Sequence, residues 1–305
     1  MDFIAKIKKV FKSTEKIQDP PKITPAPPAP ALEIAKKIRG NHKPVIFIYG
    51  VTARSGTNYL GALLKEHPGL FYCPRKWYEA NFLEVVPDLI LLQKTFEEKS
   101  RIVCPLEQHD FSRLLGAALI AYLYDGIQEQ QQILLKAVGT KNLGLFFEMF
   151  PYENVILLLR DGRDVVESTC ATWPKTPFDE TCIKWAANAT EILAFEEKGT
   201  YPKDAYLIVR YEDVFDNPLG ETARILKHFC LDPKLYPAEK AERVPVIGTS
   251  ELKKYGRIHW NPIPKPEGFN PIGRWKQWTK DQKKTFKDIA GQTLIRCGYA
   301  SDMTW

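Results

Sequence analysis

Residues 45–64 read VIFIYGVTARSGTNYLGALL, and this stretch decides the fold. VIFIYG (45–50) is a continuous apolar run ending in glycine, as expected of a strand buried on both faces of a parallel sheet. The residues from Thr57 onward read as a helix, so a short loop joins a buried strand to a helix N-terminus. Because Gly50 and Gly56 allow tight turning, several backbone N–H groups can converge, and the loop is predicted to cradle an anion.

The side chains of this loop strengthen the predicted anion site. Arg54 adds a fixed positive charge with planar donors. Hydroxyl and amide donors come from Ser55, Thr57 and Asn58. The loop departs from the P-loop pattern G-x-x-x-x-G-K-[ST], since Gly50 to Gly56 is one residue too long and Thr57 stands where the lysine belongs. ATP chemistry is therefore disfavoured, although a kinase-like P-loop phosphotransferase remains an alternative.

Strand and helix patterns alternate along the rest of the chain. Further apolar runs typical of buried strands lie at 133–138, 155–160 and 205–211. Helical patterns lie at 57–66, 80–97, 111–130, 142–150, 161–171, 179–197, 217–229 and 280–296. This alternation predicts an α/β fold, a P-loop-like three-layer sandwich whose central parallel sheet is flanked by helices. Ligands of such sheets bind at the carboxyl ends of the strands.

The charge distribution separates the N-terminal residues from the remainder. Of 305 residues, 44% are hydrophobic and 26% charged, values typical of a globular protein. Residues 1–43 hold ten Lys or Arg and four Asp or Glu, whereas residues 44–305 hold 33 of each sign. The net charge of +6 therefore lies entirely before residue 44. Because residues 44–305 lack a basic bias, nucleic acid is not expected as a partner.

Three segments are predicted from these patterns. Residues 1–18 form a basic amphipathic helix, a shape that can lie on an anionic membrane or dock on a partner, with a solvated terminus as the alternative. Residues 19–43 form a linker, because six prolines fall within residues 20–30. Residues 44–305 form the globular domain, which includes a loop-rich stretch at 231–274.

The cysteines and hydropathy bear on location and metals. The six cysteines form no C-x-x-C pair and none stands at zinc spacing with a histidine, so we expect reduced thiols and no metal. No run of 18 apolar residues occurs, and the N-terminus lacks an uninterrupted apolar segment. These features predict a cytoplasmic protein and leave open peripheral membrane contact through residues 1–18.

A second anion site is predicted where the third strand ends. The sequence LLLRDGRDVVES places Arg160 at the carboxyl end of that strand and Ser168 eight residues further on, two turns into a helix. An arginine and a hydroxyl facing one cleft make a compact site for a terminal phosphate. Arg163 and Asp164 are expected to fix the turn between them.

These two motifs together resemble the sulfotransferase superfamily. TARSGTNYL (52–60) is similar to the R-S-G-T-T loop that binds the 5′-phosphosulfate in the Golgi-type and protein-tyrosine branches, and KEHPGL (65–70) matches the turn after it. FPYENVILLLRDGRDVVES (150–168) is similar to the motif that binds the 3′-phosphate. The resemblance spans roughly residues 44–300 and implies 3′-phosphoadenosine 5′-phosphosulfate (PAPS) as co-substrate, without a metal.

Two weaker motifs extend the resemblance toward the C-terminus. LIVRYEDVFDNP (207–218) resembles the strand and turn in which a tyrosine ring contacts adenine, a position matched by Tyr211, with packing at a strand end as the alternative. GRWKQW (273–278) resembles the loop on the cofactor side before the last helix. This implies cofactor-binding roles for Arg274 and Trp275, with Lys276 beside them.

The resemblance also implies a catalytic base. A hydroxyl acceptor must lose its proton as sulfur is attacked, and a carboxylate can accept it. Glu79 in EANFL (79–83) matches the E-x-x-F-[FL] element of carbohydrate sulfotransferases, and Lys76 precedes it by three residues. Glu84 and His109 are the reserve candidates. The C-G-E-E-T element of the protein-tyrosine branch is broken, because Pro74 and Arg75 follow Cys73.

The sequence therefore predicts a sulfotransferase that acts on a hydroxyl acceptor, with a carbohydrate or glycoconjugate favoured. Glu79 would accept the proton, while Arg54, Lys76 and the loop N–H groups would neutralise charge on the transferred group. A tyrosine-directed protein sulfotransferase, a P-loop phosphotransferase and a non-catalytic nucleotide-binding module are the alternatives.

Overall fold

The computed structural model describes residues 30–73, 75–77, 79–102, 106–128, 130–250, 253–254, 257–258 and 262–305. The chain divides into two compact units, Met1–Pro30 and Ala31–Trp305, and the second is described below. The helix predicted at residues 1–18 lies outside the described residues. None of the described helices is both long and apolar enough to cross a bilayer.

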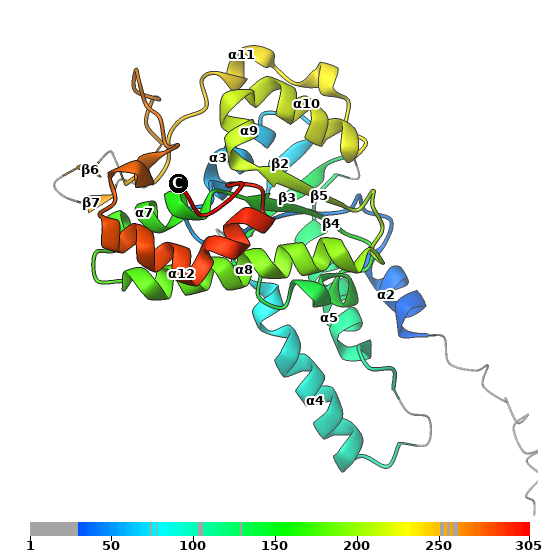
Figure 1. Cartoon of the computed structure of the whole chain (residues 1–305). Coiled ribbons are helices and arrows are strands. Elements are labelled where there is room, and N and C mark those ends of the chain that lie inside the picture. Colours follow the sequence, from blue (N-terminus) through cyan, green and yellow to red (C-terminus); the bar gives the residue numbers. More distant parts are fainter. Residues whose placement is uncertain are drawn as a thin grey trace, which may run out of the picture. The chain divides into compact units, whose positions relative to one another are not determined.

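A five-stranded parallel sheet forms the centre of the second unit (Figure 1). Its strands are β1 (Ile46–Gly50), β2 (Leu70–Tyr72), β3 (Gln132–Val138), β4 (Asn154–Leu159) and β5 (Tyr206–Arg210). Their order across the sheet is β2-β3-β1-β4-β5, and each pairs in parallel with its neighbours. The predicted parallel sheet is confirmed, and its carboxyl ends bring the loops after β1, β3, β4 and β5 together.

Two hydrophobic cores lie on opposite faces of this sheet. Phe47 and Tyr49 of β1 belong to one core, whereas Ile46 and Ile48 belong to the other, as the alternation of side chains along a strand requires. The first core is covered by α4 (Val86–Lys99), α5 (Asp110–Tyr124), α6 (Phe146–Met149), α7 (Gly162–Thr172), α8 (Phe178–Lys198) and α12 (Lys280–Arg296). The second is covered by α3 (Thr57–Leu64), α9 (Tyr211–Asp216), α10 (Pro218–His228) and α11 (Ala238–Ala241). The predicted three-layer sandwich is therefore confirmed.

The prediction of a linker over residues 19–43 needs correction. Residues Ala31–Arg39 form helix α2, which packs on α5 and belongs to the compact unit that begins at Ala31. Arg39 at its end is buried against Glu153, with Nε donating to the carboxylate at 2.6 Å. The prolines end before this helix, so proline content is no guide to the residues that follow.

Other differences concern short elements. β2 has three residues, and the predicted helix at 80–97 is divided into the 3₁₀ turn η1 (Phe82–Glu84) and α4. The predicted strand at 205–211 ends at Arg210, and α9 begins at the next residue, Tyr211. Further short elements are η2 (Leu143–Leu145), η3 (Pro233–Leu235), η4 (Arg274–Gln277) and the antiparallel pair β6 (Lys253–Lys254) and β7 (Arg257–Ile258).

Candidate active site

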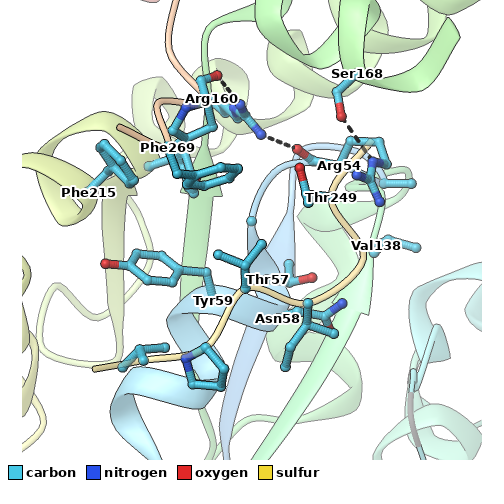
Figure 2. Close-up of a pocket in the computed structure, with 18 of the residues that line it drawn as sticks. Arg54, Thr57, Asn58, Tyr59, Val138, Arg160, Ser168, Phe215, Thr249 and Phe269 are labelled. Atoms are coloured by element: carbon cyan, nitrogen blue, oxygen red, sulfur yellow. Dashed lines mark hydrogen bonds between the residues drawn. The ribbon is translucent and has the colours of Figure 1, made fainter. Parts of the chain in front are cut away.

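A cavity of about 230 Å³ lies at the carboxyl ends of the strands. It is lined by every predicted site residue except Ser55, Lys76, Trp275 and Lys276 and the reserve candidates Glu84 and His109. Figure 2 shows Arg54, Ser168 and Asn58 on one side of the cavity and Tyr59, Phe215 and Phe269 on the other. The cavity therefore has a polar, cationic end and an aromatic end.

The loop after β1 is held in shape by its own polar groups. Ser55 is buried, and its hydroxyl donates to the Thr52 carbonyl at 2.7 Å while accepting from the Thr52 N–H at 3.0 Å. Gly56 adopts φ 96°, and a Cβ there would lie 2.3 Å from the Tyr211 ring. Ser55 thus shapes the loop instead of facing the cavity, and residue 56 has room only for glycine.

The N-terminus of α3 faces the same cavity. Its first residue, Thr57, and the following Asn58 both line the cavity, and no described side chain caps the helix. The first backbone N–H groups of a helix lack partners within that helix, so they are suited to binding an anion. This is the predicted cradle for the 5′-phosphosulfate.

Arg54 connects the loop with the second predicted anion site. Its backbone is left-handed, with φ 72°, and its Nε donates to the Ser168 hydroxyl at 3.1 Å. Burial of the guanidinium, together with the charges of Arg160 and Arg274, lowers the pKa of Arg54 to about 10. Three guanidinium groups converging on one cavity are stabilised when a polyanion binds among them.

Arg160 is almost completely buried, with 5% of its surface exposed. Its Nη1 donates to the Arg54 carbonyl at 2.8 Å and its Nη2 to the Pro271 carbonyl at 2.7 Å. Its guanidinium carbon lies 4.2 Å from the centre of the Tyr211 ring. Arg160 Nε is buried and has no hydrogen-bond partner among the described residues. A buried unpaired donor of this kind fits a site that binds a phosphate.

Asp164 holds the loop before the last helix, Gly273 and Arg274, against the cavity. Its carboxylate accepts from the backbone N–H groups of Gly273 at 2.8 Å and Arg274 at 2.7 Å. Burial raises the pKa of Asp164, and these N–H groups oppose that rise. Trp275 instead packs its ring 4.0 Å from the Arg163 guanidinium. Arg274 therefore lines the cavity, whereas Trp275 packs against Arg163 and lies outside it.

Glu79 reaches the polar end from an irregular segment between β2 and η1. This segment lies beside β3, because the Ala80 N–H donates to the Lys136 carbonyl at 2.9 Å and Asn81 Oδ1 accepts from the Val138 N–H at 3.2 Å. Glu79 is exposed to solvent and is not on a helix.

The other candidates for the catalytic step do not line the cavity. Lys76 is exposed, with φ 57°, and does not line it. The reserve candidates Glu84 and His109 do not line it either. Of the three candidate proton acceptors, Glu79, Glu84 and His109, Glu79 is therefore the one that lines the cavity.

Lys136 is a residue beside the site that the sequence patterns missed; it does not line the cavity itself but contacts Asn58, which does. It lies on β3, and its Nζ donates to Asn58 Oδ1 at 2.6 Å. Burial lowers the pKa of Lys136, and the nearby Glu79 carboxylate opposes this effect. The one available signal was a charged residue inside the apolar run ILLKAV (133–138), just before a strand's carboxyl end.

The aromatic end includes a wall that the sequence showed only as loop. Val244, Val246 and Phe269 of the stretch 231–274 line the cavity together with Tyr59. Lys265 of the same stretch places its Nζ 4.3 Å from the centre of the Phe215 ring. An apolar slot of this kind beside an anion site suits a flat heteroaromatic base.

Comparison with known proteins agrees with this geometry. Residues 44–233, more than half of the chain, match the family model described as the sulfotransferase family. The protein-tyrosine sulfotransferase of Drosophila melanogaster is 23% identical over 263 residues, which cover 81% of this chain and 50% of that protein. Protein-tyrosine sulfotransferase 1 of Danio rerio is 23% identical over 268 residues, which cover 84% of this chain and 72% of that protein. The chain thus spans only half the length of the Drosophila relative.

A solved structure has the same fold. The sulfotransferase domain of the Synechococcus PCC 7002 olefin synthase superposes with a TM-score of 0.51 and 19% identity. The match covers 83% of this chain and 96% of that domain. The chain therefore belongs to the sulfotransferase family, as the resemblance of its two anion-site motifs predicted.

Proposed function

We propose that this chain transfers the sulfuryl group of PAPS to the hydroxyl of an acceptor, and that the acceptor is a carbohydrate or glycoconjugate. The observation that carries this proposal is the cavity that joins Arg54, the Arg160–Ser168 pair and Glu79. It combines two anion sites with a carboxylate at one end. The family match gives no support to the phosphotransferase alternative.

Bound PAPS would supply an activated sulfuryl group on a phosphate leaving group. The N–H groups at the start of α3 would hold its 5′-phosphate, and Arg160, Ser168 and Arg274 its 3′-phosphate. Arg54 and Lys136 would stabilise negative charge on the transferred oxygens, since preorganised donors of this kind usually supply the largest catalytic effect. Glu79 would accept the proton of the acceptor hydroxyl.

The acceptor would enter at the end of the cavity that holds Glu79. Trp173 lines this cavity with 42% of its surface exposed, and the guanidinium carbon of Arg54 lies 6.0 Å from its ring centre. An exposed indole in a pocket offers an apolar face for a ring-shaped acceptor. The EANFL element (79–83) favours a sugar, while the protein-tyrosine relatives favour a tyrosine side chain as the second candidate.

An acceptor screen with sulfur-labelled PAPS tests the proposal. Methyl glycosides and oligosaccharides form one arm, acidic tyrosine peptides the second and 4-nitrophenol the third. Labelled sugar supports the proposal, and labelled peptide alone would replace the carbohydrate by tyrosine. If PAPS raises the melting temperature no more than ATP does at equal concentration, the assignment of the two anion sites is wrong.

We also propose a cytoplasmic location with peripheral attachment to anionic membranes through residues 1–18. The support is the sequence, in which residues 1–43 carry the entire net charge of +6 and residues 1–18 have an amphipathic pattern. Full-length protein should co-sediment with phosphatidylserine vesicles at low salt, and a variant lacking residues 1–18 should not. Equal sedimentation of the two proteins would contradict the attachment.

A further inference from the structure

Asn58 lines the cationic end of the cavity and makes a short hydrogen bond with Lys136, which lies beside the cavity without lining it. Asn58 is the second residue of α3, and Lys136 lies two residues before the end of β3, 78 positions further along the chain. Lys136 Nζ donates to Asn58 Oδ1 at 2.6 Å. The amide group of Asn58 is thereby oriented, with its carbonyl oxygen on the lysine.

The surroundings explain why this lysine needs a fixed position. Leu134, Leu135 and Ala137 on the same strand are buried, so the Lys136 stem leaves an apolar sheet. A lysine carries a compact charge on a flexible four-carbon stem, and its position depends on the partners of its head. The Glu79 carboxylate is close enough to affect the pKa of Lys136.

Attraction between Lys136 and Glu79 would harm both proposed roles. An ammonium paired with the carboxylate would no longer face the transferred group. The same pairing would make Glu79 a weaker base, because a nearby cation favours the ionised carboxylate. Lys136 is half-buried, so solvent screens its attraction to a nearby carboxylate less than it would for a fully exposed lysine. A neutral acceptor that holds the ammonium apart from Glu79 would keep both groups available.

We propose that Asn58 is a positioning residue that holds the Lys136 ammonium toward the transferred sulfuryl group and away from Glu79. This inference rests on the proposed function. It differs from the expectation that Asn58 serves mainly as a donor to the cofactor. Asn58 then acts through Lys136. Loss of the Asn58 side chain should lower the affinity for PAPS, which carries the sulfuryl group, more than the affinity for 3′,5′-ADP, which lacks it.

Calorimetric titration with the two nucleotides tests this difference without any acceptor. For Asn58→Ala we expect PAPS affinity to fall about tenfold, the effect of losing one hydrogen bond to a charged group. The affinity for 3′,5′-ADP should stay within about threefold of the parent, on the same scale. Lys136→Met should show the same selective loss. Asn81→Ala is the matched control, because the Asn81 side chain accepts from the Val138 N–H and not from Lys136. The preference of this variant for PAPS over 3′,5′-ADP should be unchanged.

A spectroscopic measurement separates positioning from a general structural role. In protein labelled at lysine ¹³Cε, the Lys136 signal is identified by its loss in Lys136→Met. In Asn58→Ala the ammonium moves to Glu79, so the pKa of Lys136 should rise, and the added change Glu79→Gln should reverse that rise.

Three results decide the outcome. Equal losses of PAPS and 3′,5′-ADP affinity in Asn58→Ala would overturn the inference, and so would an unchanged Lys136 titration. If the parent protein binds PAPS no more tightly than ATP, the proposed function itself fails, which distinguishes the two results.

Discussion

Glu79 is the residue on which the proposed chemistry depends most directly. Replacing it by glutamine keeps the shape of the side chain and removes the proton acceptor, so single-turnover sulfuryl transfer should slow by about 10²–10⁴. PAPS affinity should change little. Glu84→Gln is the control, because Glu84 is also exposed but does not line the cavity. Equal rates for parent and Glu79→Gln, with Glu84→Gln inactive, would show that the base is assigned to the wrong carboxylate.

The clustered arginines predict how nucleotide affinity depends on pH. The pKa of Arg54 is lowered to about 10 by burial and by Arg160 and Arg274, so above that pH the free protein loses this charge. Bound anions favour the charged form, and affinity for 3′,5′-ADP should therefore be flat near neutrality and fall as pH rises through about 10. Fluorescence titration from pH 7 to about 10.5 measures this, bracketing the lowered pKa.

The matched variant for this profile is Arg54→Gln. This variant should bind 3′,5′-ADP more weakly than the parent at neutral pH, and its affinity should fall less steeply at high pH. The fall that remains is attributed to Lys136, because burial also lowers the pKa of Lys136. A decline as steep as that of the parent would mean that Arg54 is not the titrating group.

Local patterns predicted most of the individual site residues but not their partners. Arg54, Arg160 and Ser168 stand at fixed offsets from strand ends, and such offsets can be seen in the sequence. Lys136 could not be assigned in this way, because it lies within an apolar strand and meets Asn58 only when β3 pairs with β1. Ser55 was predicted to bind the cofactor, but its hydroxyl is used within the loop, a choice that no spacing reveals.

At the scale of elements, the loop between β1 and α3 depends on Gly56. Gly56→Ala should reduce 3′,5′-ADP affinity by at least about tenfold and lower the melting temperature, because the added Cβ would lie 2.3 Å from the Tyr211 ring and φ is 96°. Gly126→Ala is the matched control, since its φ is 78° but nothing lies within 4 Å of the added atom. It should cost about 1 kcal/mol of stability and leave binding unchanged. Similar binding losses in both variants would mean that the contact with Tyr211 is unimportant.

Elements with a clear period were predicted well, and those without one were not. The four longer strands and the main helices follow from apolar runs and helical spacing. β2 has only three residues, too few to show a pattern. The described residues of the wall at 244–250 and 262–271 are mostly irregular backbone, whose position depends on contacts such as Val246 with Ile263 and Pro271 with Arg160. Long-range contacts of this kind leave no local signal.

At the scale of the whole molecule, α2 is attached to the domain by the buried pair Arg39–Glu153. Arg39→Met should destabilise the fold at pH 7 by about 3–5 kcal/mol, because it leaves a buried carboxylate without its partner. Burial already raises the pKa of Glu153, and loss of Arg39 would raise it further. An acid whose native pKa is raised binds its proton more tightly in the folded state, so the variant's stability should fall as pH rises through that native pKa.

Urea unfolding at pH 5 and at pH 7.5 measures this dependence. The deficit of Arg39→Met relative to the parent should be larger at pH 7.5. The double variant Arg39→Met/Glu153→Gln should recover part of the stability at pH 7.5 and lose the pH dependence. If each variant loses as much unfolding free energy at pH 5 as at pH 7.5, and the two variants lose the same amount, the Glu153 carboxylate is not the cause of the deficit.

The bonds from Asp164 to the N–H groups of Gly273 and Arg274 also have a consequence for synthesis. The first anion site is encoded near residue 54 and the second near residue 160, yet the arginine that completes the cavity follows more than a hundred residues later. A nascent chain that has released only its first 230 residues carries both phosphate-binding motifs but neither the partner of Asp164 nor the aromatic wall. We therefore expect bound nucleotide to assist folding chiefly after residue 274 has left the ribosome.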